Sequence, residues 1–252
     1  MSDLLLAIDT ATDVASIAVG TAQEVSVVVS VRGARSQSAQ IIELVDQALV
    51  LAGGAGKEGV RALSGIIVGD GPGSFTGLRI GWAAAKGLAH ERGLSLSAVP
   101  SLMGAAAGAA AWGALAGPVG ACFDALRGQV YGAVYEFHAD RVETLVAPEV
   151  VTVPELARLA PARPRVVVGD GAVRYAADVV AWIGAPPVGL EALPPIAASL
   201  LVLVPRAGAV RTLPDPHTAE PVYGRPAEAQ AKWEARHGRP LSDPSRATQR
   251  RP

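Results

Sequence analysis

The chain has 252 residues, and its 22 Lys and Arg residues nearly cancel its 23 Asp and Glu residues, which leaves a formal net charge of −1. This balance excludes a polybasic nucleic-acid-binding arm as the dominant feature of the chain. Because 50% of the residues are hydrophobic and only 18% are charged, disorder is also excluded for most of the chain.

The first hundred residues predict one α/β lobe. Three β-branched or aliphatic runs separated by short polar turns predict an antiparallel meander over residues 4–9, 14–20 and 24–31. Helical spacing of apolar residues then predicts a helix over 36–52, a buried strand over 65–69 and a second helix over 74–90. A short strand near Leu96 and a helix over 101–116 follow, so the order is βββαβαβα.

The same order starts again at Pro118. Residues 119–124, 129–137 and 141–146 predict a second meander, and a short helix follows over 154–160. The string Val-Gly-Asp-Gly occurs at 68–71 and again at 168–171, each time at the end of a predicted strand. We therefore expect an N-terminal lobe at 1–100, a smaller C-terminal lobe at 101–219, a helix within 220–237 that packs back on the first lobe, and a disordered tail at 238–252.

Residues 94–123 contain no ionisable side chain except the thiol of Cys122, and this length could span a membrane. The stretch is rich in Ala and Gly and is interrupted by Pro100, Gly117 and Pro118, so a buried helix is favoured over a span. Cys122 is the only cysteine of the chain, which excludes an intrachain disulfide and fits a reducing cytosol. The apolar run before Asp9 is too short for a signal peptide, so we expect a cytoplasmic protein without membrane contact.

Duplicated βββαβα lobes, each with an aspartate at the end of the first strand, are the layout of the actin, Hsp70 and sugar-kinase class. This actin-like fold (ASKHA, RNase H-like) holds nucleotide in the cleft between its lobes, where turns approach the phosphates. The candidates for weak nucleotide or phosphate contacts are the strand-end aspartates, the first hairpin turn and a glycine-rich turn before the second helix: Asp9, Thr10, Thr12, Gly71, Gly73, Ser74 and Asp124.

These candidates leave structural alternatives open. The hydroxyls of Thr10 and Thr12 suit phosphate or magnesium-bound water, and they equally suit their own turn. The string DGPGSFTG at 70–77 could cradle an anion at a helix N-terminus, but it lacks the lysine of a Walker loop. A tight turn with Ser74 as the N-cap is the favoured interpretation.

Both predicted helices of the first lobe suggest close packing. Gly77, Gly81 and Ala85 are spaced four apart, which leaves a stripe without bulk where another element can approach. The apolar positions of the helix at 36–52 cover an arc of about 180°, wider than the ~100° that one core face requires. The surplus fits either a partner helix or deep burial in the chain itself.

Four motifs make the chain resemble the TsaB (YeaZ-type) family, the non-catalytic partner in bacterial tRNA threonylcarbamoyladenosine synthesis. They are LAIDTAT at 6–12, GPGSFTGLRIG at 71–81, DALRGQVY at 124–131 and EPVY at 220–223, and the second is the most specific. The resemblance implies a complex with the catalytic subunit TsaD and the ATPase TsaE, a homodimer when alone, and contact with tRNA only through the complex. It places the partner interface on the helices at 36–52 and 74–90, at Ser38, Ile41, Leu44, Val45, Ala48, Leu78, Gly81 and Trp82.

The resemblance also implies that this chain is not itself an enzyme. TsaD has two metal-binding histidines four residues apart, and the matching positions here are Ser101 and Ala105, which cannot replace imidazole. The four histidines are scattered without an i, i+4 pair, so no metal site is predicted. No cofactor is required on this view, although ATP or ADP could bind at the complex interface. A bulky residue at Gly81 is expected to weaken partner binding and leave the monomer folded.

Two points depart from this expectation. Family members commonly have a histidine before the serine at the start of the first helix, where this chain has Gln37 before Ser38, which removes any polar interface contact of that histidine. The arginine-rich tail at 238–252 has no family role. The alternative function is an autonomous ATP-dependent enzyme of the actin and sugar-kinase class that holds magnesium with Asp9 or Asp124; a metallopeptidase lacks both ligands and a nucleophile.

Overall fold

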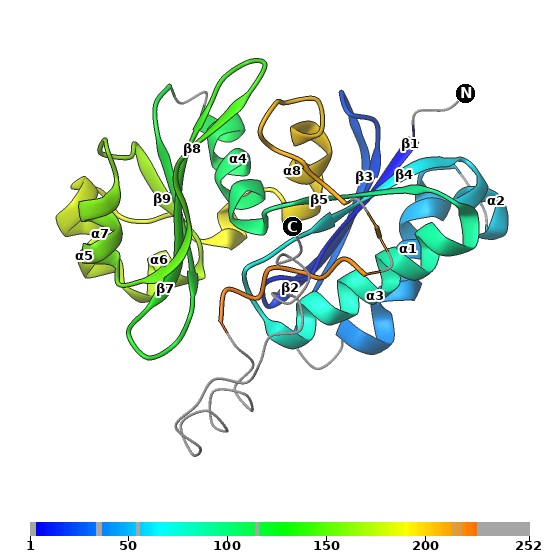
Figure 1. Cartoon of the computed structure of the whole chain (residues 1–252), viewed down its shortest axis with the longest axis horizontal. Coiled ribbons are helices and arrows are strands. Elements are labelled where there is room, and N and C mark those ends of the chain that lie inside the picture. The colour runs from blue at the N-terminus through cyan, green and yellow to red at the C-terminus, as the bar shows by residue number, and fades with distance from the viewer. Residues whose placement is uncertain are drawn as a thin grey trace, which may run out of the picture.

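The computed structural model describes residues 4–33, 37–53, 56–113, 116–213, 215–216 and 218–225. Its elements form two α/β lobes, each built around one sheet (Figure 1). The predicted helix after Pro226 and the predicted tail lie outside the described residues.

The first lobe contains a six-stranded sheet in the order β10-β5-β4-β1-β2-β3. β1, β2 and β3 form the predicted antiparallel meander, and β4 and β5 continue the sheet parallel to β1. β10 pairs antiparallel with β5 and was not predicted, because two residues carry no periodicity. The bounds are β1 Leu4–Asp9, β2 Val14–Gly20, β3 Val25–Arg32, β4 Leu63–Gly69, β5 Ser95–Val99 and β10 Arg211–Thr212.

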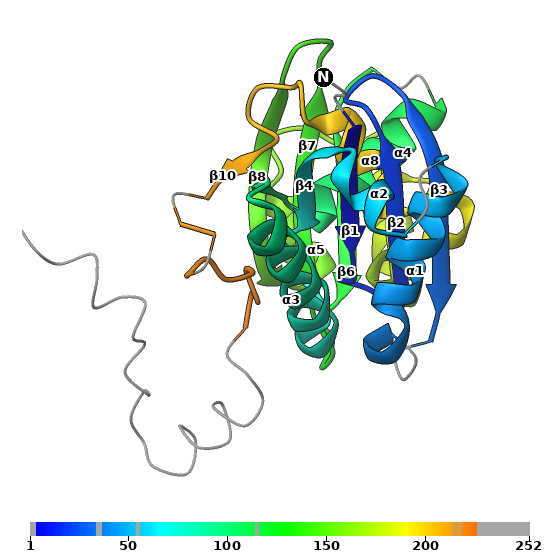
Figure 2. The same cartoon turned by 90° about the vertical axis from the view of Figure 1, so that its right-hand side faces the viewer.

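Helices cover both faces of this sheet. α1 (Gln37–Leu51) and α3 (Phe75–Arg92) lie side by side on one face, next to the short α2 (Gly56–Arg61), as Figure 2 shows. α8 (Ile196–Leu203) covers the opposite face, and α4 (Ser101–Gly113) packs between α8 and the second sheet. The largest hydrophobic cluster therefore runs continuously from one lobe into the other.

The second lobe repeats the strand order of the first on a smaller scale. Its sheet has the order β8-β7-β6-β9, which matches β3-β2-β1-β4, with an antiparallel meander and one parallel strand. The predicted duplication is thus confirmed. The bounds are β6 Val119–Asp124, β7 Val130–Phe137, β8 Val142–Val151, β9 Val166–Val168, α5 Val153–Leu159, α6 Asp170–Arg174, α7 Ala176–Ile183 and a 3-10 turn, η1, Leu190–Ala192.

The apolar stretch that was weighed as a membrane span forms β5, α4 and β6. α4 is buried between the lobes, and its glycines let α8 approach closely, since a Cβ on Gly104 would lie 2.8 Å from Ile196 Cγ2. No helix among the described residues combines the length and apolar character needed to cross a membrane.

Residues 220–225, here called the C-terminal strap, connect the two lobes. The Val222 N–H donates to the Asp70 carbonyl at 2.9 Å, and the Tyr223 ring lies 4.7 Å from the Phe75 ring. Arg225 donates to the Ala125 carbonyl and to the Gln129 side chain of the second lobe. The strap therefore closes one side of the space between the lobes.

Candidate functional site

A cleft with a volume of about 490 Å³ lies between the lobes, and both hairpin turns line it. The first lobe contributes the turn around Thr12 and the glycine-rich turn, and the second lobe contributes the turn after Asp124. Tyr223 and Arg225 of the strap complete the wall. Of the seven predicted nucleotide or phosphate contacts, the structure brings four to this cleft: Thr12, Gly73, Ser74 and Asp124.

Asp9 does not face the cleft, which corrects its prediction as a magnesium or phosphate contact. Its side chain is fully buried, and its carboxylate accepts hydrogen bonds from Ser101 Oγ at 2.6 Å and from the Ala11 N–H at 3.2 Å. Burial raises the pKa of Asp9 to about 6, against the lowering effect of these hydrogen bonds. Asp9 therefore anchors the start of α4 to the end of β1.

The two threonines of the first turn form hydrogen bonds within the chain. Thr10 is buried, and its hydroxyl donates to the Gly77 carbonyl at 2.7 Å. Thr12 Oγ1 donates to the Val14 carbonyl at 3.3 Å and accepts from the Val14 N–H at 3.2 Å. Of the two interpretations of these hydroxyls, the structure supports the one in which they stabilise their own turn and α3.

The glycine-rich turn also has the structural role that its sequence favoured. Ser74 Oγ accepts from the Gly77 N–H at 3.2 Å, so Ser74 is the N-cap of α3 as predicted. The Ser74 N–H donates to the Ala11 carbonyl at 2.7 Å, and a Cβ on Gly73 would lie 2.2 Å from that carbonyl oxygen. Gly71, which has a φ of +86°, is held by Ser101 and lies against the strap instead of lining the cleft.

Asp124 is the predicted contact whose carboxylate lies at the cleft and could still meet a ligand. Its carboxylate forms an ion pair with Arg174 at 2.8 Å and accepts from the Leu126 N–H at 3.0 Å. The neighbouring Asp170 accepts from the Asp124 N–H at 3.2 Å, and burial raises the pKa of Asp170. These two carboxylates form the acidic floor of the cleft.

Sequence reasoning missed the unusual backbone beside Asp124. Leu126 and Arg127 have φ values of +61° and +55°, and the Leu126 side chain is 61% exposed. Leucine rarely adopts this conformation, and such positions cluster at functional sites. The only hint in the sequence was Gly128, which follows directly and also has a positive φ, so residues 126–128 are three successive left-handed residues.

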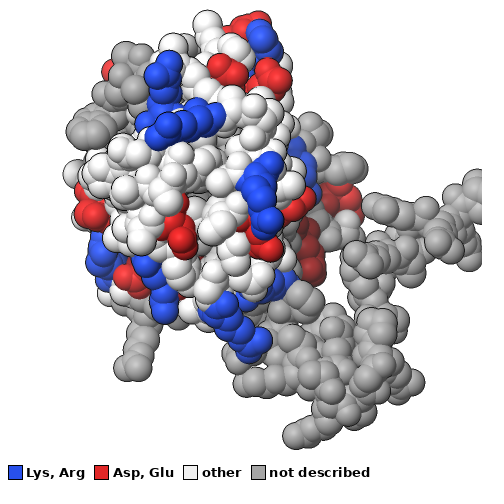
Figure 3. Space-filling view, turned by 90° about the vertical axis from the view of Figure 1, so that its left-hand side faces the viewer, with Lys and Arg blue, Asp and Glu red and all other residues white. Residues whose placement is uncertain are grey.

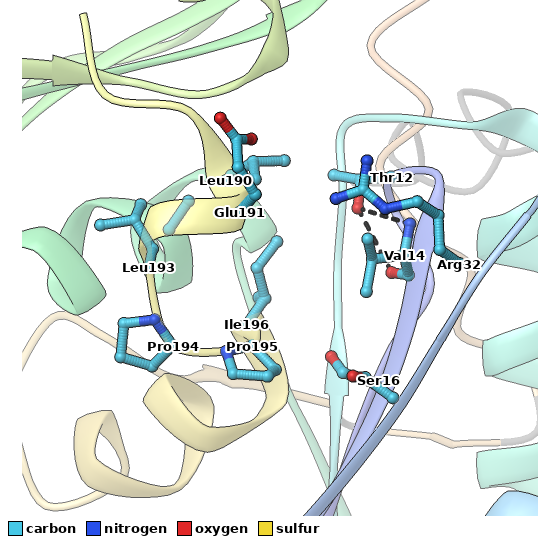
Figure 4. A pocket seen from close by; sticks show the side chains of 12 residues that line it. Thr12, Val14, Ser16, Arg32, Leu190, Glu191, Leu193, Pro194, Pro195 and Ile196 are labelled. Atoms are coloured by element: carbon cyan, nitrogen blue, oxygen red, sulfur yellow. Dashed lines mark hydrogen bonds between the residues drawn. The ribbon is translucent and has the colours of Figure 1, made fainter.

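A second pocket of about 240 Å³ lies between the β2–β3 hairpin and the segment before α8, and Thr12 lines both this pocket and the cleft. Figure 4 shows Arg32 and Glu191 projecting from opposite walls. Ala105 lines this pocket with a methyl group, and Ser101 is occupied with Asp9. The two positions that the resemblance aligns with metal-binding histidines therefore supply no imidazole here.

The predicted partner interface needs correction at the level of side chains. Leu44 is half-buried, and the side chain of Ser38 lies outside the described residues. The other six belong to the chain's own core and cannot line a surface in this structure: Ile41, Val45, Ala48, Leu78, Gly81 and Trp82. Gly81 packs on Thr10, because a Cβ there would lie 2.3 Å from Thr10 Oγ1.

The outer face of the same two helices nevertheless carries several exposed apolar side chains among polar ones. On α1, the side chains of Ile42, Val50 and Leu51 are 56%, 50% and 60% exposed, so the apolar surplus expected from the wide arc is present. On α3, a stripe of exposed or half-buried residues follows the alternating spacing of four and three that suits helix–helix packing: Thr76, Ile80, Ala83, Gly87 and His90. α1 and α3 lie side by side (Figure 2), so these exposed apolar side chains and the stripe of mostly small residues share one outer face with polar neighbours such as Glu43, Asp46 and Arg79.

Sequence comparison identifies relatives with a shared role. The family model for TsaD, described as tRNA N6-adenosine threonylcarbamoyltransferase, matches residues 27–176. The tRNA threonylcarbamoyladenosine biosynthesis protein TsaB of Bacillus subtilis (strain 168) is 34% identical over 176 residues, which cover 68% of this chain and 73% of that protein. The protein of the same name from Escherichia coli (strain K12) is 35% identical over 156 residues, which cover 58% and 64%.

Solved structures agree with these relatives. YeaZ from Pseudomonas aeruginosa superposes with a TM-score of 0.69 at 25% sequence identity, and the match covers 88% of this chain and 100% of that chain. A second structure, described as an uncharacterized protein with similarity to peptidase YEAZ from Pseudomonas aeruginosa, gives a TM-score of 0.68 at 27% identity, with coverage of 89% and 100%. The match extends over both lobes.

Proposed function

The chain belongs to the TsaB (YeaZ) family, and from this premise we propose that it is a non-catalytic subunit of tRNA threonylcarbamoyladenosine biosynthesis. In this role it binds and activates a TsaD-type catalytic subunit, which transfers threonylcarbamoyl from its adenylate to N6 of adenosine 37 in ANN-decoding tRNAs. TsaE is the third component, and tRNA meets this chain only through the complex. The reaction takes place in the cytoplasm.

The exposed apolar side chains of α1 beside the stripe of mostly small residues on α3 are the observation that carries this proposal. Ile42, Val50 and Leu51 are each at least half exposed, and large apolar side chains left at the surface beside polar ones such as Glu43 and Asp46 are typical of interaction sites. Ala83 and Gly87 on the neighbouring helix keep the surface flat, because a Cβ on Gly87 would meet nothing within 4 Å. A helix pair from a related lobe can pack there, whether it belongs to the catalytic subunit or, in its absence, to a second copy of this chain.

The chemistry between the lobes supports a non-catalytic role. The first-strand aspartate Asp9 is sealed from solvent, and Ser101 and Ala105 stand where the catalytic relative has histidine ligands. A transferase active site needs groups that reach the reacting atoms, and these three side chains do not. The difference from the catalytic relative therefore lies in these side chains and not in the fold.

The large cleft remains suitable for a nucleotide as a ligand. Phe75 and Tyr223 offer ring surfaces, Arg127 and Arg225 offer cations for phosphates, and Asp124 with Asp170 offers acceptors. We propose that ATP or ADP binds there without being turned over by this chain. Binding that is abolished by Arg225→Met, with no ATP hydrolysis by the purified chain, is the expected result; steady hydrolysis lost in Asp124→Asn supports the autonomous enzyme instead.

The decisive test is reconstitution of the modification. Threonylcarbamoyladenosine on tRNA is measured by mass spectrometry in a mixture of the adenylate-forming enzyme, TsaD and TsaE, with and without this protein. We expect product only when both this chain and TsaD are present. Product that forms equally well without this chain refutes the accessory role.

A further inference from the structure

The end of the β7–β8 hairpin gathers three metal-ligating side chains, far from the cleft and from the α1 and α3 surface. Glu136 and Glu143 are directly opposite each other in the register of the two strands. His138 follows Glu136 by two residues, so it lies on the same face of the hairpin. The donor atoms of the three side chains all lie within 4.8 Å of one another.

The backbone at this position is fixed by hydrogen bonds. The His138 N–H donates to the Arg141 carbonyl at 2.9 Å and closes the turn. Arg206 Nη1 donates to the His138 carbonyl at 3.0 Å, and the Ala207 N–H donates to the Asp140 carbonyl at 3.0 Å. The three side chains therefore start from a defined scaffold, and only their rotamers remain adjustable.

The charges of this cluster are not balanced within the hairpin. Two carboxylates directly opposite each other on one face repel, and this arrangement destabilises a strand pair unless a cation lies between them. His138 Nε2 is a buried atom without a hydrogen bond, and it lies 3.8 Å from the Glu143 carboxylate, beyond hydrogen-bond length. The nearby Arg206 is bonded to a backbone carbonyl, and Arg141 lies 3.6 Å from Asp140.

We propose that Glu136, His138 and Glu143 form a binding site for a divalent transition-metal ion of the Zn²⁺ type. One imidazole and two carboxylates are ligands that Zn²⁺ accepts, and a three-ligand site leaves the fourth position for water. Bonds of about 2 Å bring tetrahedral ligand atoms to about 3.3 Å from one another. Rotation of the Glu143 side chain, which is 55% exposed, supplies most of this closure.

The chemistry of the cluster selects the kind of metal. Ca²⁺ requires six to eight oxygen ligands and Mg²⁺ prefers an octahedron of oxygens and waters, so an imidazole with two carboxylates suits neither. The surrounding outer face of the second lobe carries acidic and basic side chains interspersed, which gives no broad attraction for cations (Figure 3). Binding must therefore depend on the three side chains themselves.

The test uses the full-length, tag-free protein and Zn²⁺ in competition with a chromogenic chelator. We expect one Zn²⁺ per chain, with affinity weakened on the order of 100-fold in His138→Ala, Glu136→Gln and Glu143→Gln. Glu149→Gln on the same strand and His90→Ala on α3 are the matched controls and should bind as the wild type does. Because Glu143 is exposed, its variant is expected to fold normally, which circular dichroism verifies.

Cu²⁺ substitution gives a second measurement that does not depend on affinity. The electron paramagnetic resonance spectrum should show nitrogen coupling from one imidazole, and this coupling should disappear in His138→Ala. Wild-type protein that binds no Zn²⁺, or binding and nitrogen coupling that persist unchanged in His138→Ala, would overturn the proposal. Neither measurement involves a partner protein, so the result is independent of the proposed role in tRNA modification.

Discussion

Substitution of Gly81 by alanine tests whether the small-residue stripe of α3 serves the fold or a partner. The added Cβ would lie 2.3 Å from Thr10 Oγ1, whose hydroxyl donates to the Gly77 carbonyl. Overpacking costs about 1–3 kcal/mol and loss of the buried hydrogen bond about 1 kcal/mol, while alanine gains about 1 kcal/mol in helix propensity. The net expectation is a destabilisation of about 2 kcal/mol.

Gly87 provides a matched control in the same helix. A Cβ at this position would meet nothing within 4 Å, so Gly87→Ala should stabilise the chain by about 1 kcal/mol through helix propensity alone. Gly81→Ala should therefore lower the Tm by about 6 °C and Gly87→Ala should raise it by about 3 °C, as measured by circular dichroism during thermal unfolding. Opposite shifts from one substitution in one helix cannot come from propensity.

A double-mutant cycle identifies the contact. Without the Thr10 hydroxyl and methyl, the nearest remaining atom is Thr10 Cβ at 3.4 Å from the new Cβ, which is an ordinary contact. Gly81→Ala should then stabilise the chain by about 1 kcal/mol in a Thr10→Ala background, as Gly87→Ala does in the wild type, which corresponds to a coupling of about 3 kcal/mol. A Gly81→Ala variant that is as stable as the wild type and yet loses its partner would refute this reasoning and restore Gly81 to the interface.

Three further predictions follow from the geometry of the buried carboxylates and of the outer helix face. Burial raises the folded-state pKa of Asp9 to about 6 from 3.8, so the folded state binds the proton more tightly than the unfolded chain does, and the Asp9 contribution to stability rises by about 1 kcal/mol as the pH falls from 7 to 5. The difference between the urea unfolding free energies of wild type and Asp9→Asn should change with pH by this amount, and a difference independent of pH contradicts the prediction. Arg211→Met leaves Asp70, which is 3% exposed, without its two 2.7 Å hydrogen bonds and should lower the free energy of unfolding by about 2–3 kcal/mol. Arg174→Met, at the more exposed ion pair with Asp124, should lower it by less than about 1 kcal/mol, and equal unfolding midpoints for the two variants would show that burial does not set the cost. Ile42→Glu replaces a side chain that is 56% exposed, so it should leave the free energy of unfolding within about 0.5 kcal/mol of wild type and weaken TsaD binding at least tenfold in a titration. The neighbouring variant Glu43→Gln should bind TsaD normally, and unchanged binding of Ile42→Glu would place the interface elsewhere.

Local patterns were sufficient to predict most elements of both lobes. Alternation and apolar runs placed the two meanders, helical spacing placed α1 and α3, and the Ser74 cap was predicted because its hydroxyl acts on a backbone group three residues away. The repeated Val-Gly-Asp-Gly string predicted the duplication for the same reason, since each copy ends a strand of its own lobe. Interactions within a few residues are visible in a sequence.

Contacts between distant segments could not be predicted in this way. Arg211 meets Asp70 across 141 positions, and Ser101 meets Asp9 across 92. The width of the apolar arc on α1 was correct, but periodicity does not tell which half faces the sheet, so core residues were assigned to the interface. The hairpin cluster was missed because a search for i, i+4 histidine pairs does not detect ligands that cross-strand pairing brings together.

The two copies of the lobe use matched aspartates differently, and this difference argues for a scaffold more strongly than any missing motif does. Asp9 and Asp124 end equivalent strands, and Asp70 and Asp170 follow equivalent parallel strands. In the first lobe both carboxylates are buried, one bonded to Ser101 at the start of α4 and the other to Arg211 beside the strap. In the second lobe both still line the cleft. Of these four matched aspartates only the two of the second lobe reach the cleft, whereas the proposed scaffold role depends on α1 and α3 and needs no first-lobe carboxylate in the cleft. Asp9 and Asp70 thus connect β1 to α4 and β4 to β10, a structural use that the proposed scaffold role permits.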